Sequence, residues 1–405
     1  MKHKSILEVA DKHLLDDYQA GDFFLASPHG TLLAEGVLAR VPAQEKGNNQ
    51  LLNLSERVAA VLDKGRQAGH SKPMIVGAVP FDYIKPVQLV VPRKIRRSGP
   101  LRFEYADPEQ TSQTPAYEIQ PVPEPSEYIL GVNRGLADIK AGHFSKIVLS
   151  RSLHLTSSNK VDIHQLLHNL ARHNVQGYTF AVDLPEREAG DNSSAATGKR
   201  TLIGSSPELL VSKLGLQVRA NPLAGSRPRS KDPEEDRKRA TELLASVKDR
   251  HEHAVVVEDV VASLRPYCRT LDVPAEPSLI HTETMWHLST EIKGELSDPA
   301  TTSLELAIAL HPTPAVCGYP TDAAREAIKE IEPFERGFFT GVIGWCDADG
   351  DGEWVVTIRC AEADDYSLRL YAGAGIVTGS KAESELAETS AKFRTMLLAM
   401  GLDND

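Results

Sequence analysis

The sequence predicts a large α/β protein built mainly on antiparallel sheets. Predicted strands and helices are intermixed along its 405 residues, without the regular strand–helix alternation that is typical of a parallel sheet. Apolar residues make up 41% of the chain and charged residues 25%, a balance that supports a large buried core. The length allows one large domain or two to three small ones, and no Gly/Ser-rich linker or internal repeat divides the sequence.

The first third of the chain predicts a hairpin, a helix and two further strands. Residues 22–37 alternate around a turn at His29-Gly30, which is the pattern of a hairpin. Residues 51–69 have the spacing of an amphipathic helix. Residues 93–126 are rich in proline, arginine and polar side chains, which predicts a long surface connection and the one candidate domain boundary. The two further strands are PMIVGAVPF and QLVVP.

The middle of the chain alternates helices with strands. Helical spacing covers residues 127–141 and 163–173, and residues 208–225 have the pattern of two strands that turn at Leu214-Gly215. The polar segment 185–200 predicts an exposed loop, to which we assign no function. The other predicted strands here are KIVLSRSLHL, YTFAVDL and TLIGSS.

One long helix is predicted over residues 232–264. Pro233 suits its first turn, and Glu235 lies three residues past the cap. Beyond it, FFTGVIGWC, EWVVTIRCAEA and SLRLYAGAGI predict strands. The last helix is predicted to begin with a capping box formed by Ser380 and Glu383.

Charge and hydropathy exclude several classes of partner. The formal net charge of −11 argues against nucleic acid or an anionic membrane, although it leaves a small anionic substrate open. No apolar run approaches the length of a membrane span, and the N-terminus lacks the apolar core of a secretion signal. The four cysteines have no metal-site spacing, which indicates reduced, buried thiols. Together these features predict a cytoplasmic protein.

Two pairs of acidic residues predict a metal site. Asp249 and Glu252 lie in KDRHEH, and Glu385 and Glu388 lie in SELAET. Each pair is spaced by three residues in a predicted helix, so its members share a face. Like charges that close are unfavourable unless a cation relieves them. Brought together, the two faces would form an oxygen-rich site for a hard ion such as Mg²⁺, whereas either pair alone is explained by a solvated helix face.

Two glycine-containing motifs resemble binding loops but have the wrong spacing. DADGDGE (347–353) begins like a calcium loop, yet its twelfth position is Ile358, where that loop needs glutamate. An acidic hairpin turn is predicted instead. GAGIVTG (373–379) has the spacing GxGxxxG in place of GxGxxG, which argues against dinucleotide binding. We interpret it as a group of backbone N–H donors at a helix start, suited to a carboxylate.

Nine segments, taken in order, resemble one family. They are KIVLSR, GSSPELL, NPLAGSRPR, KDRHEH, WHLST, HPTPAVCGYP, GVIGWCDADGDGEWVVTIRCA, AGAGIV and ELAET with Lys392. The set is similar to the chorismate-utilising enzymes, which include anthranilate, aminodeoxychorismate, salicylate and isochorismate synthases. The resemblance implies one domain over residues 1–405 with an anthranilate synthase component I-like α/β (α+β) fold, in which two antiparallel sheet layers have helices outside. Residues 126–400 carry the motifs, and residues 1–125 match by size.

By this resemblance, the reaction replaces the C4 hydroxyl of chorismate with a hydroxyl from water at C2. Such chemistry needs a base on one side of the ring and an acid on the other. Lys146 matches the base position, and Glu208 matches the acid that protonates the leaving hydroxyl. The apolar neighbours of Glu208 in PELLV favour its protonated form. Outside the family, these residues would be a surface lysine at a strand end and a strand-edge carboxylate.

The resemblance also implies the metal and substrate contacts. Glu252 and Glu388 match ligands of Mg²⁺, and Asp249 and Glu385 match outer positions that would hold metal-bound water. Arg359 would pair with the enolpyruvyl carboxylate through its guanidinium fork. The other substrate-contacting positions are Gly225, Ser226, His287, Ala315, Gly373, Gly375 and Lys392. Turns, bulges, salt bridges and core packing are the ordinary alternatives for these residues.

Two positions favour isochorismate as the product. Amine-forming anthranilate synthases lack the lysine that this chain has at Lys146, and aminating or salicylate-forming relatives carry threonine in place of Ala315. The pattern is nearest to isochorismate synthases of catechol-siderophore (2,3-dihydroxybenzoate) pathways. The menaquinone-pathway enzyme, a salicylate or aminodeoxychorismate synthase, and a non-catalytic module that binds a chorismate-like ligand stay open as alternatives. We expect a monomer that binds the small molecule chorismate.

Overall fold

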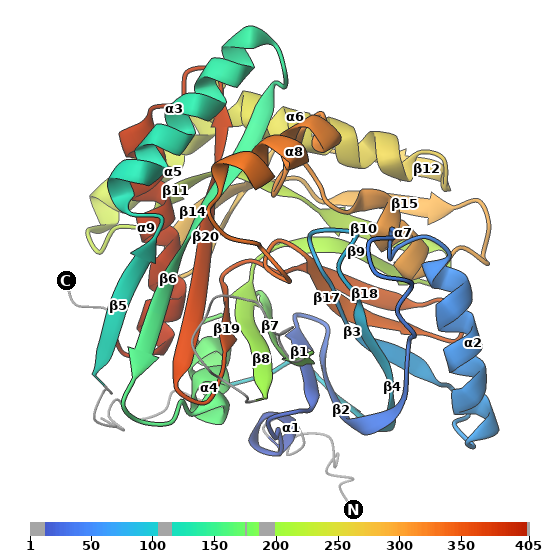
Figure 1. Ribbon diagram of the computed structural model, residues 1–405. Helices are drawn as coiled ribbons and strands as arrows, with labels where there is room; N and C mark the ends of the chain where they lie inside the picture. The colour runs from blue at the N-terminus through green and yellow to red at the C-terminus, as the bar shows by residue number, and fades with distance from the viewer. Residues whose placement is uncertain (1–12, 104–115, 175, 186–198, 403–405) are drawn as a thin grey trace, which may run out of the picture.

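The computed structural model describes residues 13–103, 116–174, 176–185 and 199–402. Among these residues, seventeen strands form one hydrogen-bonded sheet and three more form a small second sheet. The pairings between neighbouring strands are antiparallel, as the sequence predicts. The large sheet curls round (Figure 1), so the two predicted layers are arms of one continuous sheet.

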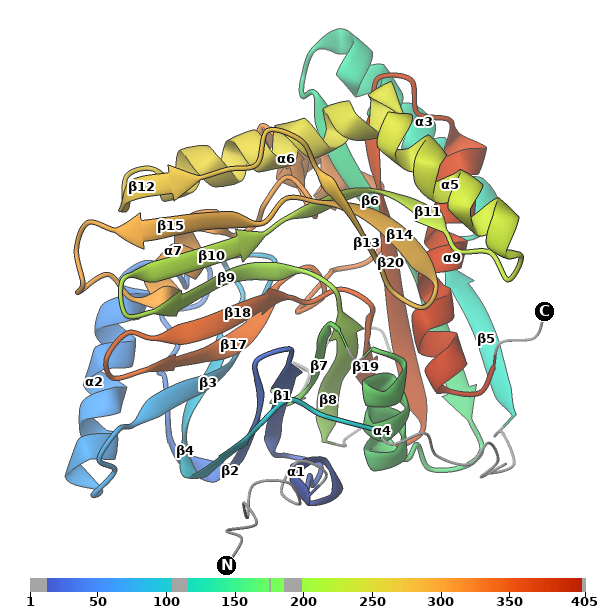
Figure 2. The same cartoon turned by 180° about the vertical axis from the view of Figure 1, so that it is seen from behind.

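The strands of the large sheet follow one another around the curl. The first arm, from its free edge, consists of β12 (Cys268–Asp272), β15 (Ile292–Leu296), β10 (Gln217–Asn221), β9 (Leu209–Leu214), β18 (Gly352–Val356), β17 (Val342–Asp347) and β3 (Met74–Val79). The bend consists of β4 (Gln88–Ser98), β2 (Gly30–Arg40), β1 (Phe23–Ser27) and β7 (Tyr178–Leu184). The second arm consists of β8 (Arg200–Ser206), β19 (Cys360–Ala363), β20 (Ser367–Val377), β6 (Lys146–Ser157), β5 (Tyr117–Val122) and the short β16 (Gly318–Tyr319). Figure 2 shows the small sheet of β11 (Leu223–Pro228), β13 (Ser278–His281) and β14 (Met285–Ser289) beside the end of the second arm.

Helices cover the outer faces of this sheet. Helix α9 lies along β20, and α3 packs on both α9 and β6. Helices α5 and α6 pack on the small sheet, α2 packs on the bend, and α4 packs on β7 and β8. A buried cluster that includes Phe23, Phe180, Leu202, Ile343 and Val355 joins strands of both arms. The helix bounds are α1 (His13–Asp16), α2 (Leu54–Gln67), α3 (Pro125–Ala141), α4 (Ile163–His173), α5 (Pro233–Ala245), α6 (Val247–Leu264), α7 (Ser303–Leu310), α8 (Thr321–Ile331) and α9 (Ala382–Ala399).

The predicted single helix over residues 232–264 is wrong, because the segment forms α5 and α6. Ser246 between them is extended, with φ −71° and ψ 116°, and its side chain accepts the backbone N–H of Asp249. A serine hydroxyl that satisfies a free N–H is the preferred cap of a new helix. The break therefore starts α6 just before Asp249, and places Asp249 and Glu252 on its buried face.

Three other stretches differ from the sequence prediction. The supposed connection at 93–126 includes the end of β4 and all of β5, while part of it lies outside the described residues. The run 208–225 holds three strands rather than two, since β11 also begins there. EWVVTIRCAEA divides into β18 and β19, because Arg359 between them has a left-handed backbone with φ 51°.

The start of the last helix also corrects the sequence analysis. The N-cap of α9 is Lys381, which makes no side-chain cap bond, so the predicted capping box of Ser380 is not formed. The hydroxyl of Ser380 accepts the N–H of Val377 at 3.2 Å. Gly373 and Gly375 lie inside β20, so they are not the predicted group of N–H donors at a helix start.

The remaining predicted elements are confirmed, with shifted ends. The first hairpin, the acidic turn at 347–353 and the turn at Gly215 are all present. The four cysteines form no disulfide. Most of the loop predicted at 185–200 lies outside the described residues. Among the described helices, none has the length and apolar character that crossing a membrane requires.

Candidate active site

Most of the residues singled out from the sequence line one cleft, although they come from distant segments. Those that line it are Glu208, Gly225, Ser226, Glu252, His287, Ala315, Arg359, Gly373, Gly375, Glu388 and Lys392. The other three are Lys146, Asp249 and Glu385, which are buried without being part of the lining. The curl of the sheet brings these residues together, because the cleft is lined by residues from β11, β14, β20, α6 and α9 and from the chain just before β9.

Glu208 is a buried carboxyl group at the junction of β8 and β9. Its side chain is closed off from solvent, and its Oε1 accepts the N–H of Leu223 at 3.4 Å. Burial raises the pKa of Glu208 to about 7, although the Leu223 N–H and the charges of Lys146 and Lys392 oppose the rise. A carboxyl group with this pKa carries a proton near neutral pH, which is what a general acid needs.

Arg359 and His287 form a second group in the cleft. The guanidinium Nη2 of Arg359 lies 3.3 Å from Nε2 of His287, and Nη1 donates to the hydroxyl of Thr395 at 3.3 Å. Burial and the charge of Arg359 hold the pKa of His287 well below its ordinary value, so this imidazole is neutral and can accept. Among the described residues, no acidic side chain forms an ion pair with Arg359. A buried guanidinium in this position is suited to an incoming carboxylate.

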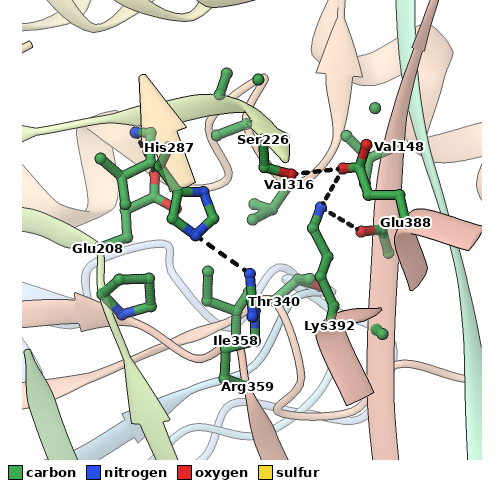
Figure 3. A pocket seen from close by; sticks show the side chains of 18 of the residues that line it. Val148, Glu208, Ser226, His287, Val316, Thr340, Ile358, Arg359, Glu388 and Lys392 are labelled. Carbon is green, nitrogen blue, oxygen red and sulfur yellow. Dashed lines mark hydrogen bonds and ion pairs between the residues drawn. The ribbon is translucent and has the colours of Figure 1, made fainter. Parts of the chain in front are cut away.

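Ser226, Glu388 and Lys392 form a third group, which faces Arg359 across the cleft (Figure 3). The hydroxyl of Ser226 donates to Glu388 Oε1 at 2.9 Å, and Lys392 Nζ lies 2.7 Å from the same oxygen. Lys392 also donates to the carbonyl of Gly373 at 2.8 Å. Although burial disfavours the charged carboxylate, Lys392 and Ser226 help to lower the pKa of Glu388. Glu388 is therefore ionised at neutral pH.

Lys146 and Glu252 form a buried ion pair beneath Gly375. Lys146 is fully buried in β6, and its Nζ lies 3.1 Å from Glu252 Oε1 without a hydrogen bond of good geometry. A Cβ added at Gly375 would lie 2.1 Å from Glu252 Oε1 and 3.2 Å from Cε of Lys146. Only glycine leaves room for this pair. The packing of Lys146 and Glu252 therefore requires glycine at Gly375, which the sequence predicts as a substrate contact.

The two outer carboxylates bind basic side chains. Asp249 Oδ2 lies 2.8 Å from Arg227, and Glu385 Oε1 lies 2.8 Å from Lys248. Burial, together with the nearby charge of Glu388, raises the pKa of Glu385, whereas Lys248 lowers it. The charges of the two carboxylates on α9 therefore interact.

Comparison with known proteins identifies the family. Residues 86–401 match the family described as chorismate binding enzyme. This chain belongs to that family. It is 62% identical over 399 residues to isochorismate synthase DhbC of Bacillus subtilis, covering 98% of both chains. The crystal structure of DhbC from Bacillus anthracis superposes with a TM-score of 0.90 at 56% identity, covering 97% of this chain and 100% of that one.

The fold is shared more widely than the sequence. Anthranilate synthase component I from Streptococcus pneumoniae has a TM-score of 0.68 at 21% identity, covering 98% of this chain and 94% of that one. At this identity the likeness concerns the fold alone. The anthranilate synthase component I-like fold expected from the sequence is therefore confirmed for this chorismate-binding enzyme.

The four carboxylates have the donor chemistry of a magnesium site. All donors are carboxylate oxygens, which Mg²⁺ prefers, and the charge conflict between Glu385 and Glu388 is one that a divalent cation would relieve. In the described ranges, however, no three acidic, histidine or cysteine side chains are grouped closely enough to hold a metal ion. Basic side chains neutralise each carboxylate instead.

Sequence reasoning missed several residues that line this cleft or contact its carboxylates. Thr340 lines it with a left-handed φ of 57°, and Lys248 and Arg227 neutralise the outer carboxylates. Lys248 lies directly before Asp249 in KDRHEH, so its position next to an acidic motif was a usable signal. Thr340 gave none, because threonine seldom adopts this backbone conformation.

Proposed function

We propose that this chain is an isochorismate synthase that interconverts chorismate and isochorismate with Mg²⁺. The observation that carries the proposal is Glu208, a carboxyl group that faces the cleft and whose pKa of about 7 suits an acid catalyst. The Arg359 guanidinium, which forms no ion pair with any described residue, supplies a site for a substrate carboxylate. The curated relative that is 62% identical is itself named an isochorismate synthase.

In the proposed reaction, Lys146 takes a proton from water as the water oxygen bonds to C2 of the ring. The ring double bonds shift, the C4–O bond breaks, and Glu208 gives its proton to the leaving hydroxyl, which departs as water. One proton is taken and one is given, so the formula of the substrate is unchanged. Lys146 can act only after its ion pair with Glu252 opens and its ammonium group gives up a proton. Proton exchange with solvent then restores both side chains.

Two anionic groups of chorismate would be held at opposite sides of the cleft. Arg359 would bind the enolpyruvyl carboxylate, and His287, held neutral, keeps the guanidinium in place through its contact at 3.3 Å. Glu252 and Glu388 would hold Mg²⁺, with Asp249 and Glu385 behind them. Bound Mg²⁺ would supply positive charge for the ring carboxylate. Ser226 would add its hydroxyl, and Gly225 would add its backbone N–H.

A direct test is to incubate the protein with chorismate and Mg²⁺ and to identify the product by chromatography. Isochorismate as the main product supports the proposal. Salicylate, an aminated product or unchanged chorismate would each reject it. The same mixture without Mg²⁺, treated with a chelator, is the control for the metal.

Replacing Ala315 with threonine should lower isochorismate output or change the product mixture. Ala315 lines the cleft, and an added hydroxyl must find a partner there or cost about 1–3 kcal/mol. The matched control is Ala315→Val, which has the shape of threonine without the hydroxyl. A shift seen with threonine alone assigns the effect to the hydroxyl, whereas equal changes in both variants would show that only size matters. Chromatography of the products measures both.

Glu252→Gln and Glu388→Gln should weaken Mg²⁺ binding more than Glu385→Gln. The first two residues line the cleft and Glu385 does not, so only the first two would lose a direct anionic ligand. Loss of an outer partner costs about 10- to 100-fold in metal affinity. The loss of Mg²⁺ affinity in Glu252→Gln and Glu388→Gln should be larger than the loss in Glu385→Gln. Calorimetric titration of Mg²⁺ in the presence of chorismate measures this. Equal affinities in all three variants would place the metal elsewhere.

The same proposal includes a monomer that works in the cytoplasm for catechol-siderophore synthesis. The four cysteines are free thiols. The solved DhbC of Bacillus anthracis is named as specific for 2,3-dihydroxybenzoate, the aromatic acid of such siderophores. Light scattering tests the monomer, and loss of 2,3-dihydroxybenzoate production on gene deletion tests the pathway.

A further inference from the structure

A buried arginine outside the cleft contacts three residues that line it. Arg336 lies after α8, is 4% exposed, and does not line the cleft itself. Its Nη2 donates to the carbonyl of Val148 at 2.7 Å, and its Nη1 donates to the carbonyl of Val316 at 2.7 Å. Nη1 also donates to the hydroxyl of Thr340 at 3.3 Å. One planar guanidinium thus holds three separate segments of the cleft wall.

Glu332, the C-cap residue directly after α8, completes this arrangement. Its carboxylate pairs with Arg336, and both side chains are only 2% exposed. Oε1 of Glu332 also accepts the backbone N–H of Ser150 at 2.7 Å. Two successive polar groups on the same stretch of β6, the Val148 carbonyl and the Ser150 N–H, are therefore held by one ion pair. We call Glu332 and Arg336 the clamp.

The clamp fixes the segments that carry two proposed functional residues. Val148 lies two residues after Lys146 in β6, so the clamp sets the position of the strand that presents the base. Val316 follows Ala315 directly, so the same guanidinium sets the position of the residue assigned to product choice. Arg336 is also stacked over Phe81, with 4.6 Å from its Cζ to the ring centroid, which leaves it little freedom to move.

We propose that Glu332 and Arg336 are positioning residues that hold Lys146 and Ala315 at the spacing that the reaction requires. This inference rests on the proposed function, because it concerns the alignment of those two residues. A buried ion pair is by itself a poor source of stability. Its contacts to Val148, Val316 and Ser150 instead give it a geometric role, and misplacement of about 1 Å by a mutation away from the chemistry can cost about 10²-fold in rate.

The test uses three variants. Arg336→Lys keeps the charge but lacks the fork that reaches both carbonyl groups, so kcat should fall by about 10²-fold while KM changes less. Glu332→Gln/Arg336→Met removes both charges together, which avoids leaving one buried charge unpaired. Lys329→Met/Glu326→Gln is the control, because it removes an ion pair of 3.1 Å on the exposed face of the same helix. The control should leave kcat unchanged.

Thermal unfolding and kinetics of the double clamp variant separate positioning from stability. We expect the double variant to be folded at the assay temperature, as a cooperative thermal transition would show, while its kcat stays about 10²-fold low with a changed product ratio. A folded double variant with kcat near the wild-type value would overturn the proposal.

Amide hydrogen exchange gives a readout that does not depend on the reaction. In Arg336→Lys, peptides covering 146–151 and 313–318 should exchange faster than in wild type, and unchanged exchange would contradict the clamp. Failure of the proposed function would appear separately, as a wild-type enzyme that makes a product other than isochorismate. The effect of the clamp is then measured on whichever product the wild type releases.

Discussion

Replacing Lys146 with methionine is expected to lower kcat by about 10²- to 10⁴-fold, the usual contribution of a general base. Methionine keeps the length and apolar stem of lysine at a fully buried position, so it avoids the cavity that alanine would leave. Lys146→Ala should show the same kinetic loss with an added loss of stability. Both follow from the assignment of Lys146 as the group that takes a proton from water.

Metal binding separates this role from a structural one. Lys146 Nζ lies 3.1 Å from Glu252 Oε1, so its removal frees a carboxylate oxygen, and Mg²⁺ affinity should not fall. The matched control is Lys213→Met, because Lys213 is 3% exposed and pairs with Asp351 at 3.0 Å away from the cleft. A Lys146 variant with a rate near wild type, or a control variant that loses as much activity, would reject the assignment.

Replacing Glu208 with glutamine is the second change with a large expected effect, again about 10²- to 10⁴-fold in kcat. The wild-type rate should fall as pH rises through about 7, because the carboxyl group with that pKa then loses the proton that it must donate. The glutamine variant should lack this alkaline limb. A wild-type profile that is flat from pH 6 to about pH 8 would contradict the role of Glu208 as the acid.

Stability should change with pH at the same residue. The pKa of Glu208 is raised from 4.5 to about 7 by burial, so the folded state holds the proton more tightly than the unfolded chain does. Its contribution to stability is therefore lost as pH rises from the unfolded pKa to the folded one, by about 3 kcal/mol. Between pH 5 and pH 8, wild type should therefore lose stability relative to Glu208→Gln. Urea unfolding of both proteins at the two pH values would measure this difference.

Glu353 provides the control for that experiment. It is buried in β18, does not line the cleft, and burial raises its pKa to about 7 as well. Glu353→Gln should therefore change the dependence of stability on pH in the same way as Glu208→Gln does. Unlike Glu208→Gln, it should retain the fall of kcat at alkaline pH. If Glu353→Gln also removed that limb, the limb would report global stability and not proton donation.

The sequence by itself predicted most of the polar residues that line the cleft, and it determined how neighbouring ones are arranged. Alternation along KIVLSR places Lys146 and Val148 on one face of β6, and a spacing of three places Glu385 beside Glu388 on α9. These are local consequences of strand and helix geometry. The order of the family motifs supplied the roles of Glu208, Arg359 and the rest, and the comparisons confirmed the family.

Only the tertiary structure decided which of these groups meet. It also revealed two local breaks. The Ser246 hydroxyl accepts the N–H of Asp249 and divides a predicted helix, and the left-handed Arg359 divides a predicted strand. The pairing of Lys146 with Glu252, and the contacts of the clamp with Val148 and Ser150, depend on how the sheet curls. Contacts between residues so far apart in the chain depend on how all the intervening elements pack, so no local pattern encodes them.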